Sequence, residues 1–336
     1  MKKIACCLII SIILSGCATY DLAEDNFDNY FKETYLKDPK SEDNMIMNMR
    51  DRLKSDPNNP TYLYNLGHSY YLCELYDDAV EPLEKAKILE PKAFDICITL
   101  SAVYFGLHKY QEAERGFKEA IALKPKDIDS HVGLARVYKR VGDKNKYDEQ
   151  LNIIEKINKK KANELSKQME EEYEQKKEYN SELSSQDTKK AADLIIAGKY
   201  WDATKECNKA IESDPNNSTA YYNMGIALKH LGMYHKALAF YKQAVYLDPE
   251  DVNTYINMGS IYLTTGRENE AINVLRKAIS INSNIPETYS NLGLAYKELG
   301  NIKEAKESFI KALPLFESQG RNKDVDAVNR LLKEIE

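Results

Sequence analysis

Apolar and small residues recur along this chain with a fixed period. Between Tyr221 and Leu228 they stand at helical spacing, and the same pattern returns 34 residues later. The members of each of the following sets are one period apart: Gly225, Gly259 and Gly293; Ala237, Ala271 and Ala305; Ala244, Ala278 and Ala312; and, upstream, Pro57, Pro91 and Pro125. A period of this length predicts a protein built of stacked repeats.

The residues at the repeated positions resemble the tetratricopeptide repeat, a helix–turn–helix unit. The repeat that begins at Pro60 supplies a suitable residue at each key position: Leu63, Leu66, Gly67, Tyr70, Ala79, Leu83, Ala86 and Pro91. Further repeats begin at Phe94, Ile128, Ser184, Ser218, Val252 and Pro286, and those at Ile128 and Ser184 match less well. The resemblance implies an all-α superhelical solenoid of about seven helical pairs.

Each repeated position has a physical role in this interpretation. Glycine or alanine at positions 8 and 20 lets the two helices of a pair approach closely, and alanine at position 27 leaves room for the next repeat. Large apolar residues fill the seam, where full burial of each contributes about 1.5–3 kcal/mol. Proline at position 32 cannot continue the hydrogen-bond ladder, so it is expected to end the second helix.

The period divides the chain into seven predicted segments. They are a signal peptide (1–16), an acidic tether (17–41), a capping helix (42–59), a first repeat block (60–161), a charged helical connector (162–183), a second repeat block (184–319) and a C-terminal capping helix (320–336). The connector is expected to prolong the second helix of the third repeat. Leu165, Met169 and Tyr173 form a thin apolar line on it, too short for a coiled coil. We expect a solvated spacer, and a partner-binding face is the alternative.

The first residues have the features of a secretory signal. Lys2 and Lys3 precede an apolar run that is too short to span a bilayer. The run ends in Leu14-Ser15-Gly16-Cys17, which resembles the lipobox of bacterial lipoproteins. That resemblance implies a diacylglyceryl and palmitate anchor on Cys17 and a place in the bacterial cell envelope, facing the periplasm. The absence of Asp after this cysteine favours the outer membrane, and a soluble secreted protein is the alternative.

Composition excludes several classes of function. The net charge is −6 and no long basic block is present, so nucleic acid is not an expected partner. Cys73, Cys97 and Cys207 lie at helical repeat positions, where buried thiols are expected rather than disulfides. The five histidines show no metal-ligand spacing, and no phosphate-binding loop or nucleophile motif is present. We therefore expect no enzyme, no metal and no cofactor.

The resemblance also suggests where a partner would bind. Tetratricopeptide repeat proteins hold extended peptides or helices in a groove lined by their first helices. Carried over to the first block, the groove has an aromatic floor and a basic end: Tyr64, His68, Tyr71, Ile98, Ala102, Phe105, Arg136, Lys139 and Arg140. An arginine there would suit an acidic group of the partner. The alternative is that the aromatic residues pack in the seam and that the basic residues form a solvated helix face.

A row of asparagines marks position 6 of several repeats: Asn65, Asn223, Asn257 and Asn291. It resembles the asparagine ladder with which some members of the family hold peptide backbone, since an amide donates and accepts at once. Hydrogen bonding within the repeats is an equally weighted alternative. Tyr222, Ile256 and Ser290 hold position 5, so the carboxylate clamp of chaperone-binding members is not matched.

Together these features predict a non-catalytic scaffold or adaptor for other proteins, anchored to the membrane by its lipid. A docking regulator of peptidoglycan or other envelope enzymes is the alternative. The sequence leaves the partner and the oligomeric state open.

Overall fold

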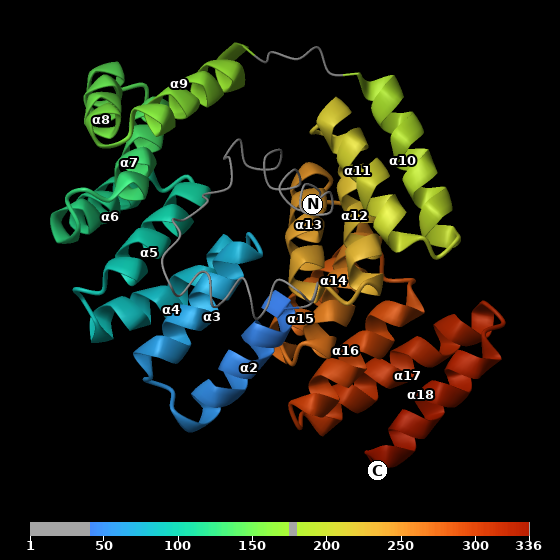
Figure 1. Cartoon of the computed structure of the whole chain (residues 1–336). Coiled ribbons are helices and arrows are strands. Elements are labelled where there is room, and N and C mark those ends of the chain that lie inside the picture. The colour runs from blue at the N-terminus through green and yellow to red at the C-terminus, as the bar shows by residue number, and fades with distance from the viewer. Residues whose placement is uncertain (1–40, 175–179, 336) are drawn as a thin grey trace. The chain divides into compact units, whose positions relative to one another are not determined.

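The structure is a computed structural model that describes residues 41–174 and 180–335 (Figure 1). Within these ranges all the regular elements are α-helices, 17 in number, and there is no strand. The predicted all-α repeat fold is therefore confirmed. The chain divides into two compact units, Met1–Asn180 and Ser181–Glu336, which we call unit 1 and unit 2. The predicted signal peptide, the lipid site at Cys17 and the tether lie outside the described residues.

Unit 1 contains three helical pairs between two single helices. Its helices are α2 (Ser41–Ser55), α3 (Pro60–Leu72), α4 (Tyr76–Leu89), α5 (Phe94–Gly106), α6 (Tyr110–Leu123), α7 (Ile128–Val141), α8 (Lys144–Ile157) and α9 (Lys159–Glu174). The helices α3 and α4, α5 and α6, and α7 and α8 pair with each other. The first helices of the pairs are also neighbours, because α5 contacts both α3 and α7. We call the surface that α3, α5 and α7 form the first-helix face of unit 1.

Unit 2 contains four helical pairs and a final single helix. Its helices are α10 (Ser181–Ile196), α11 (Tyr200–Ser213), α12 (Ser218–His230), α13 (Tyr234–Leu247), α14 (Val252–Thr264), α15 (Glu268–Ile281), α16 (Pro286–Glu298), α17 (Ile302–Ser318) and α18 (Asn322–Glu334). Its first helices are again neighbours in the order α10, α12, α14 and α16, and they form the first-helix face of unit 2. Val328 of α18 is buried against the stack while Lys333 is exposed, so α18 caps the unit as predicted.

In the repeats that have glycine at position 8, this residue allows the paired helices to approach closely, as predicted. A Cβ atom added at Gly293 of α16 would lie 2.5 Å from a ring carbon of Phe309 in α17, and one added at Gly259 would lie 2.7 Å from Leu275. Such distances are well inside van der Waals contact, so a larger side chain would force the helices apart. The alanines at positions 20 and 27 are fully buried in most repeats, which is consistent with the same role.

Proline is not required to end a second helix. The helices α4, α6, α11 and α13 each end two residues before a proline, as expected. However, α15 ends at Ile281 although Ser283 holds the proline position, and α8 ends at Ile157 although Lys159 does. The capping residues Asn158 and Asn282 adopt extended backbone angles at these ends. The turn to the next repeat is therefore formed with or without the proline.

The connector differs from its prediction in two ways. The second helix of the third repeat does not continue, because the chain is extended at Asn158 and a new helix, α9, follows. The side chain of Asn158 accepts a hydrogen bond from the Lys161 backbone at 3.1 Å, which caps the new helix. In addition, Ala162 and Leu165 are buried in the core of unit 1. The described part of the segment is thus a packed closing helix of unit 1 rather than a solvated spacer.

No helix within residues 41–174 or 180–335 has both the length and the apolar character needed to cross a bilayer.

Candidate functional site

An aromatic row lies along α3 on the first-helix face of unit 1. The ring of His68 lies 5.5 Å from the ring of Tyr64 and 6.1 Å from that of Tyr71. Tyr71 in turn lies 6.1 Å from Tyr76, the first residue of α4. The helical spacing of residues 64, 68 and 71 places them one turn apart on the same side of α3. The three aromatic residues that the sequence predicted therefore form one row, in which His68 is the neighbour of both Tyr64 and Tyr71.

These aromatic residues differ in burial. Tyr64 and Tyr71 are half-buried, so part of each ring remains at the surface. His68 between them is only 4% exposed. Burial lowers the pKa of His68 to about 4, because the charged imidazolium would lose its hydration. At neutral pH the row is therefore an uncharged aromatic surface on a rigid helix.

The predicted basic end is divided between the interior and the surface. Arg136 of α7 is 6% exposed, and Phe105 of α5 is 7% exposed. Lys139 is half-buried, and its ammonium group lies over the ring of Tyr147 at 5.1 Å from the centroid. Arg140 is exposed. Of the three basic residues, Arg140 is therefore the one whose side chain is most accessible to an acidic partner.

The position-6 asparagines have unlike surroundings. Asn223 is buried, and its amide donates to the Thr188 carbonyl oxygen of the preceding repeat over 3.4 Å. Asn257 donates to the Asn253 carbonyl oxygen at 3.1 Å and to the Tyr222 hydroxyl at 3.3 Å. These contacts use the two amides inside the stack, within a repeat and between neighbouring repeats, which favours internal hydrogen bonding over binding of a partner's backbone at these positions.

The other two asparagines of this row do not share that arrangement. Asn291 is half-buried, and its side chain has no hydrogen bond in the part of the chain that the structure describes. In unit 1, the side-chain oxygen of Asn65 is buried without a hydrogen-bond partner. A continuous ladder of equivalent amides is thus not present across the two units.

A lysine that the sequence analysis did not single out lies beside this row. The ammonium group of Lys229, at position 12 of α12, donates to the side-chain oxygen of Asn257 at 2.9 Å. Lys229 is half-buried, and burial lowers its pKa. Residues 225, 226, 232 and 233 are Gly, Ile, Gly and Met, so no carboxylate lies three or four residues away on its helix. That absence is the sequence signal that could have identified it.

The described ranges hold neither a candidate metal cluster nor a disulfide. No cluster of three or more His, Cys, Asp or Glu side chains there could hold a metal ion. The thiols of Cys73, Cys97 and Cys207 are buried, as predicted, and all three are free. Burial raises the pKa of Cys207 to about 12, so this thiol is a poor nucleophile at neutral pH.

Family models match several of these repeats. A model described as tetratricopeptide repeat matches residues 218–251, and another with the same description matches residues 286–317. A model described as TPR repeat matches residues 259–300. The chain carries tetratricopeptide repeats. In unit 1, a model for subunit 3 of the anaphase-promoting complex, or cyclosome, matches residues 44–120. No curated protein matches the chain.

Several solved structures of tetratricopeptide repeat (TPR) proteins are similar to this chain. Residues 41 to the end of MamA from Desulfovibrio magneticus are 19% identical, with 45% of this chain and 94% of that chain covered and a TM-score of 0.38. YrrB, described as a TPR protein with an unusual peptide-binding site, is 16% identical, with 70% and 93% covered and a TM-score of 0.34. A TPR protein from Parabacteroides merdae is 19% identical, with 82% and 98% covered and a TM-score of 0.37.

The repeats support a role in protein–protein interaction. Stacked helical pairs present an extended surface built from many similar first helices, and such surfaces are used for binding. TPR proteins are generally scaffolds without catalytic activity.

Proposed function

We propose that this chain is a non-catalytic adaptor that binds an extended or helical segment of another protein on the first-helix face of unit 1. The observation that carries the proposal is the aromatic row of Tyr64, His68 and Tyr71 on α3. Half-buried tyrosines on a rigid helix are typical of the residues that dominate binding energy, because they offer a large contact area with little loss of side-chain freedom.

The charges on this face suit a partner segment that carries an apolar side chain next to an acidic one. His68 is uncharged at neutral pH, so the row itself favours an apolar or aromatic side chain of the partner. Arg140 is exposed near the end of α7 on the same face, and a guanidinium is the side-chain group best suited to bind a carboxylate. An arginine at the rim contributes more to orientation and association rate than to affinity.

The adaptor would be held at a membrane by lipid on Cys17. This part of the proposal is supported by the sequence Leu14-Ser15-Gly16-Cys17 alone. Two or more acyl chains anchor a protein stably, whereas one chain binds only marginally. The site of action would then be the bacterial cell envelope, with the repeats facing the periplasm and the outer membrane as the favoured location.

Site-specific photo-crosslinking in intact cells tests the binding face. A benzophenone amino acid is placed at Tyr71 and, in a matched control, at Ile88, which is 78% exposed on the second helix α4. We expect one partner to be cross-linked from position 71 and not from position 88, with a lower yield after Tyr64→Ala. Equal products from both positions, or none from position 71, would contradict the proposal.

Metabolic labelling with an alkyne analogue of palmitate tests the anchor separately. The wild-type chain should carry the label and remain with membranes, while Cys17→Ala should lose both properties. An unlabelled wild-type chain in the supernatant would remove the membrane part of the proposal and leave the adaptor part intact.

A further inference from the structure

We propose that Lys229 on the first-helix face of unit 2 binds an aspartate or glutamate side chain of an extended segment from another protein. The inference rests on the proposed adaptor function, because it assumes that the partner is another protein. It extends that function to a second face. It assigns to that face a preference for an acid that is bound by a half-buried lysine of α12.

The geometry around Lys229 holds its ammonium group in place without neutralising it. The group donates to the side-chain oxygen of Asn257 at 2.9 Å. Asn257 is itself fixed, because its amide donates to the Asn253 carbonyl oxygen and to the Tyr222 hydroxyl. An ammonium group has three donors, so Lys229 can form further hydrogen bonds to a ligand.

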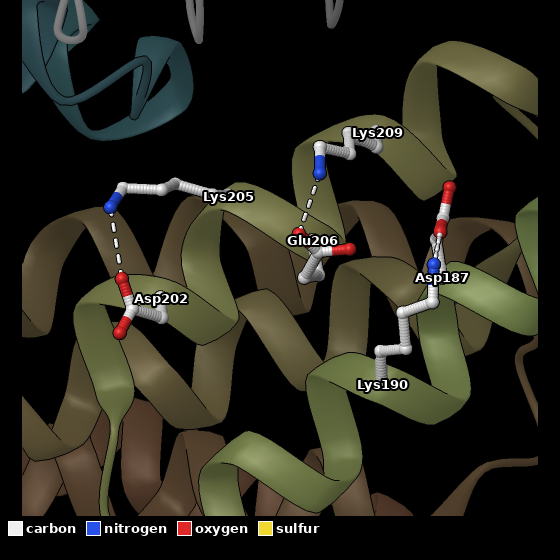
Figure 2. A network of polar contacts seen from close by, with 6 residues as sticks. All are labelled: Asp187, Lys190, Asp202, Lys205, Glu206 and Lys209. Carbon is white, nitrogen blue, oxygen red and sulfur yellow. Dashed lines mark hydrogen bonds and ion pairs between the residues drawn. The ribbon is translucent and has the colours of Figure 1, made fainter.

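Several other lysines of unit 2 form an ion pair with a carboxylate of the same helix. Figure 2 shows three of them on α10 and α11, each with a carboxylate three residues earlier in the chain. The ammonium–carboxylate distances are 2.9 Å for Lys190–Asp187, 2.9 Å for Lys205–Asp202 and 2.6 Å for Lys209–Glu206. Lys229 forms no ion pair with any residue in the described ranges of the chain. It is also more deeply placed than an ordinary surface lysine, because it is half-buried.

The equivalent lysine of a later repeat gives an internal comparison. Lys297 stands at the same position 12 in α16, and its ammonium group pairs with the carboxylate of Glu334 in the capping helix α18. The position can therefore bring a lysine and a carboxylate together within this fold. In α12 the corresponding carboxylate is not supplied by the described chain, and we infer that a partner supplies it.

The acidic residue that acts on Tyr222, the neighbour of Asn257, already has hydrogen-bond partners of its own. Asp251 is close enough to raise the pKa of Tyr222, after the larger effect of burial. However, its carboxylate caps α14 by accepting hydrogen bonds from the Asn253 backbone and the Thr254 hydroxyl. Burial without a carboxylate lowers the pKa of Lys229, and a bound acid would restore the preference for the charged form.

The surroundings point to a side chain within a continuing segment rather than a chain terminus. A single ammonium group, with both Asn257 amide hydrogens already used, offers one charge and no cluster of donors for a terminal carboxylate. Ile196, the last residue of the neighbouring helix α10, is an apolar side chain that is 85% exposed. Tyr200, just after that helix, stacks on His230 with 4.4 Å between ring centroids. The expected motif is therefore an acid close to an apolar residue.

Peptide selection against the whole chain tests the assignment. Random 12-residue peptides displayed on phage are selected on the full-length protein in detergent, and the affinities of the best peptides are measured by fluorescence polarisation. We expect a peptide family with one conserved Asp or Glu, whose replacement by Asn or Gln weakens binding about tenfold to a hundredfold. That loss should vanish in Lys229→Met, persist in Lys229→Arg, and change to a preference for a basic residue in Lys229→Glu.

Lys297→Met is the matched control, and it should leave the acid preference unchanged. The inference is overturned if no selected family contains a conserved acid, or if the acid contributes equally in wild type and Lys229→Met. It is also overturned if a peptide of residues 18–41 displaces the selected peptides from wild type but not from Lys229→Met. The occupant of the site would then be this chain itself. Failure of the proposed function is read separately, from the crosslinks at position 71, so the two results are distinguishable.

Discussion

Acidification should destabilise unit 1 through His68. Burial holds the pKa of this imidazole at about 4 in the folded chain, against an ordinary value of 6.5. The folded state therefore favours the neutral ring, and the unfolded state binds a proton first as the pH falls. Stability from this residue is fully present above pH 6.5 and is lost progressively between pH 6.5 and pH 4.

The size of the effect follows from the two pKa values. At pH 7 both states are mostly neutral, while at pH 5 the unfolded imidazole is almost fully protonated and the folded one is mostly neutral. The free energy of unfolding should fall by about 2 kcal/mol between these pH values, and by about 3 kcal/mol below pH 4. Protonation of His68, which is buried on α3, should account for this loss of stability.

Hydrogen exchange followed by mass spectrometry measures the effect in unit 1 alone. Peptides from α3 and α5 are compared at pH 7 and pH 5, after correction for intrinsic exchange rates. In His68→Gln, which keeps a polar side chain of similar length and cannot titrate, the loss on acidification should be about 2 kcal/mol smaller than in wild type. The control His230→Gln, at an exposed histidine of unit 2, should behave as wild type. An equal loss in wild type and His68→Gln would refute the reasoning.

Three further substitutions test the packing of the repeats by denaturant unfolding. Gly293→Ala should cost about 1–3 kcal/mol, because its Cβ atom meets the rigid ring of Phe309; wild-type stability would show that the helices can separate freely. Asn217→Ala should cost about 1–2 kcal/mol through loss of the α12 cap and of the 2.8 Å bond to Ser184 in the preceding repeat. Leu165→Ala should cost about 2–5 kcal/mol if α9 is part of the core, and a cost below about 0.5 kcal/mol would restore the solvated spacer.

The features that the sequence predicted are those fixed by short-range sterics. Gly67, Gly259 and Gly293 each stand where two paired helices approach closely. Their regular spacing in the sequence therefore predicts the pairing directly. Proline was a less reliable guide, because α15 ends at the same repeat position with Ser283 in its place. At this end the side chain of Asn282 accepts a hydrogen bond from the Asn284 backbone at 2.9 Å, so an asparagine supports the turn where the proline is missing.

The connector shows where periodicity fails. A charged run without glycine or proline predicts one continuous helix, yet the chain turns at Asn158 and begins again. The turn is stabilised by a side-chain cap and by burial of Ala162 and Leu165 against the third pair. Two buried residues are too few to stand out in a sequence pattern, but they suffice to dock one turn of helix.

The predicted binding residues were harder to judge than the fold, because burial decides what a polar group can do. Residue type alone did not distinguish Arg136, which is 6% exposed, from Arg140, which is at the surface. Position 12 carries a lysine in both α12 and α16, and only the contact with Glu334 shows that one of the two is neutralised. Ion pairs between different helices depend on the fold. The sequence can show only that a lysine has no carboxylate three or four residues away.

The asparagine row leads to a physical argument about how unit 2 would recognise a partner. An amide reads peptide backbone only if it has donors and acceptors to spare. Asn223 is buried and bonds to the previous repeat, and Asn257 uses its amide hydrogens within unit 2 and its oxygen on Lys229. The donors that remain for a ligand beside Asn257 are those of the charged Lys229 ammonium group. Recognition there should depend on a carboxylate at a defined place in the partner rather than on its backbone, so binding should weaken as salt rises.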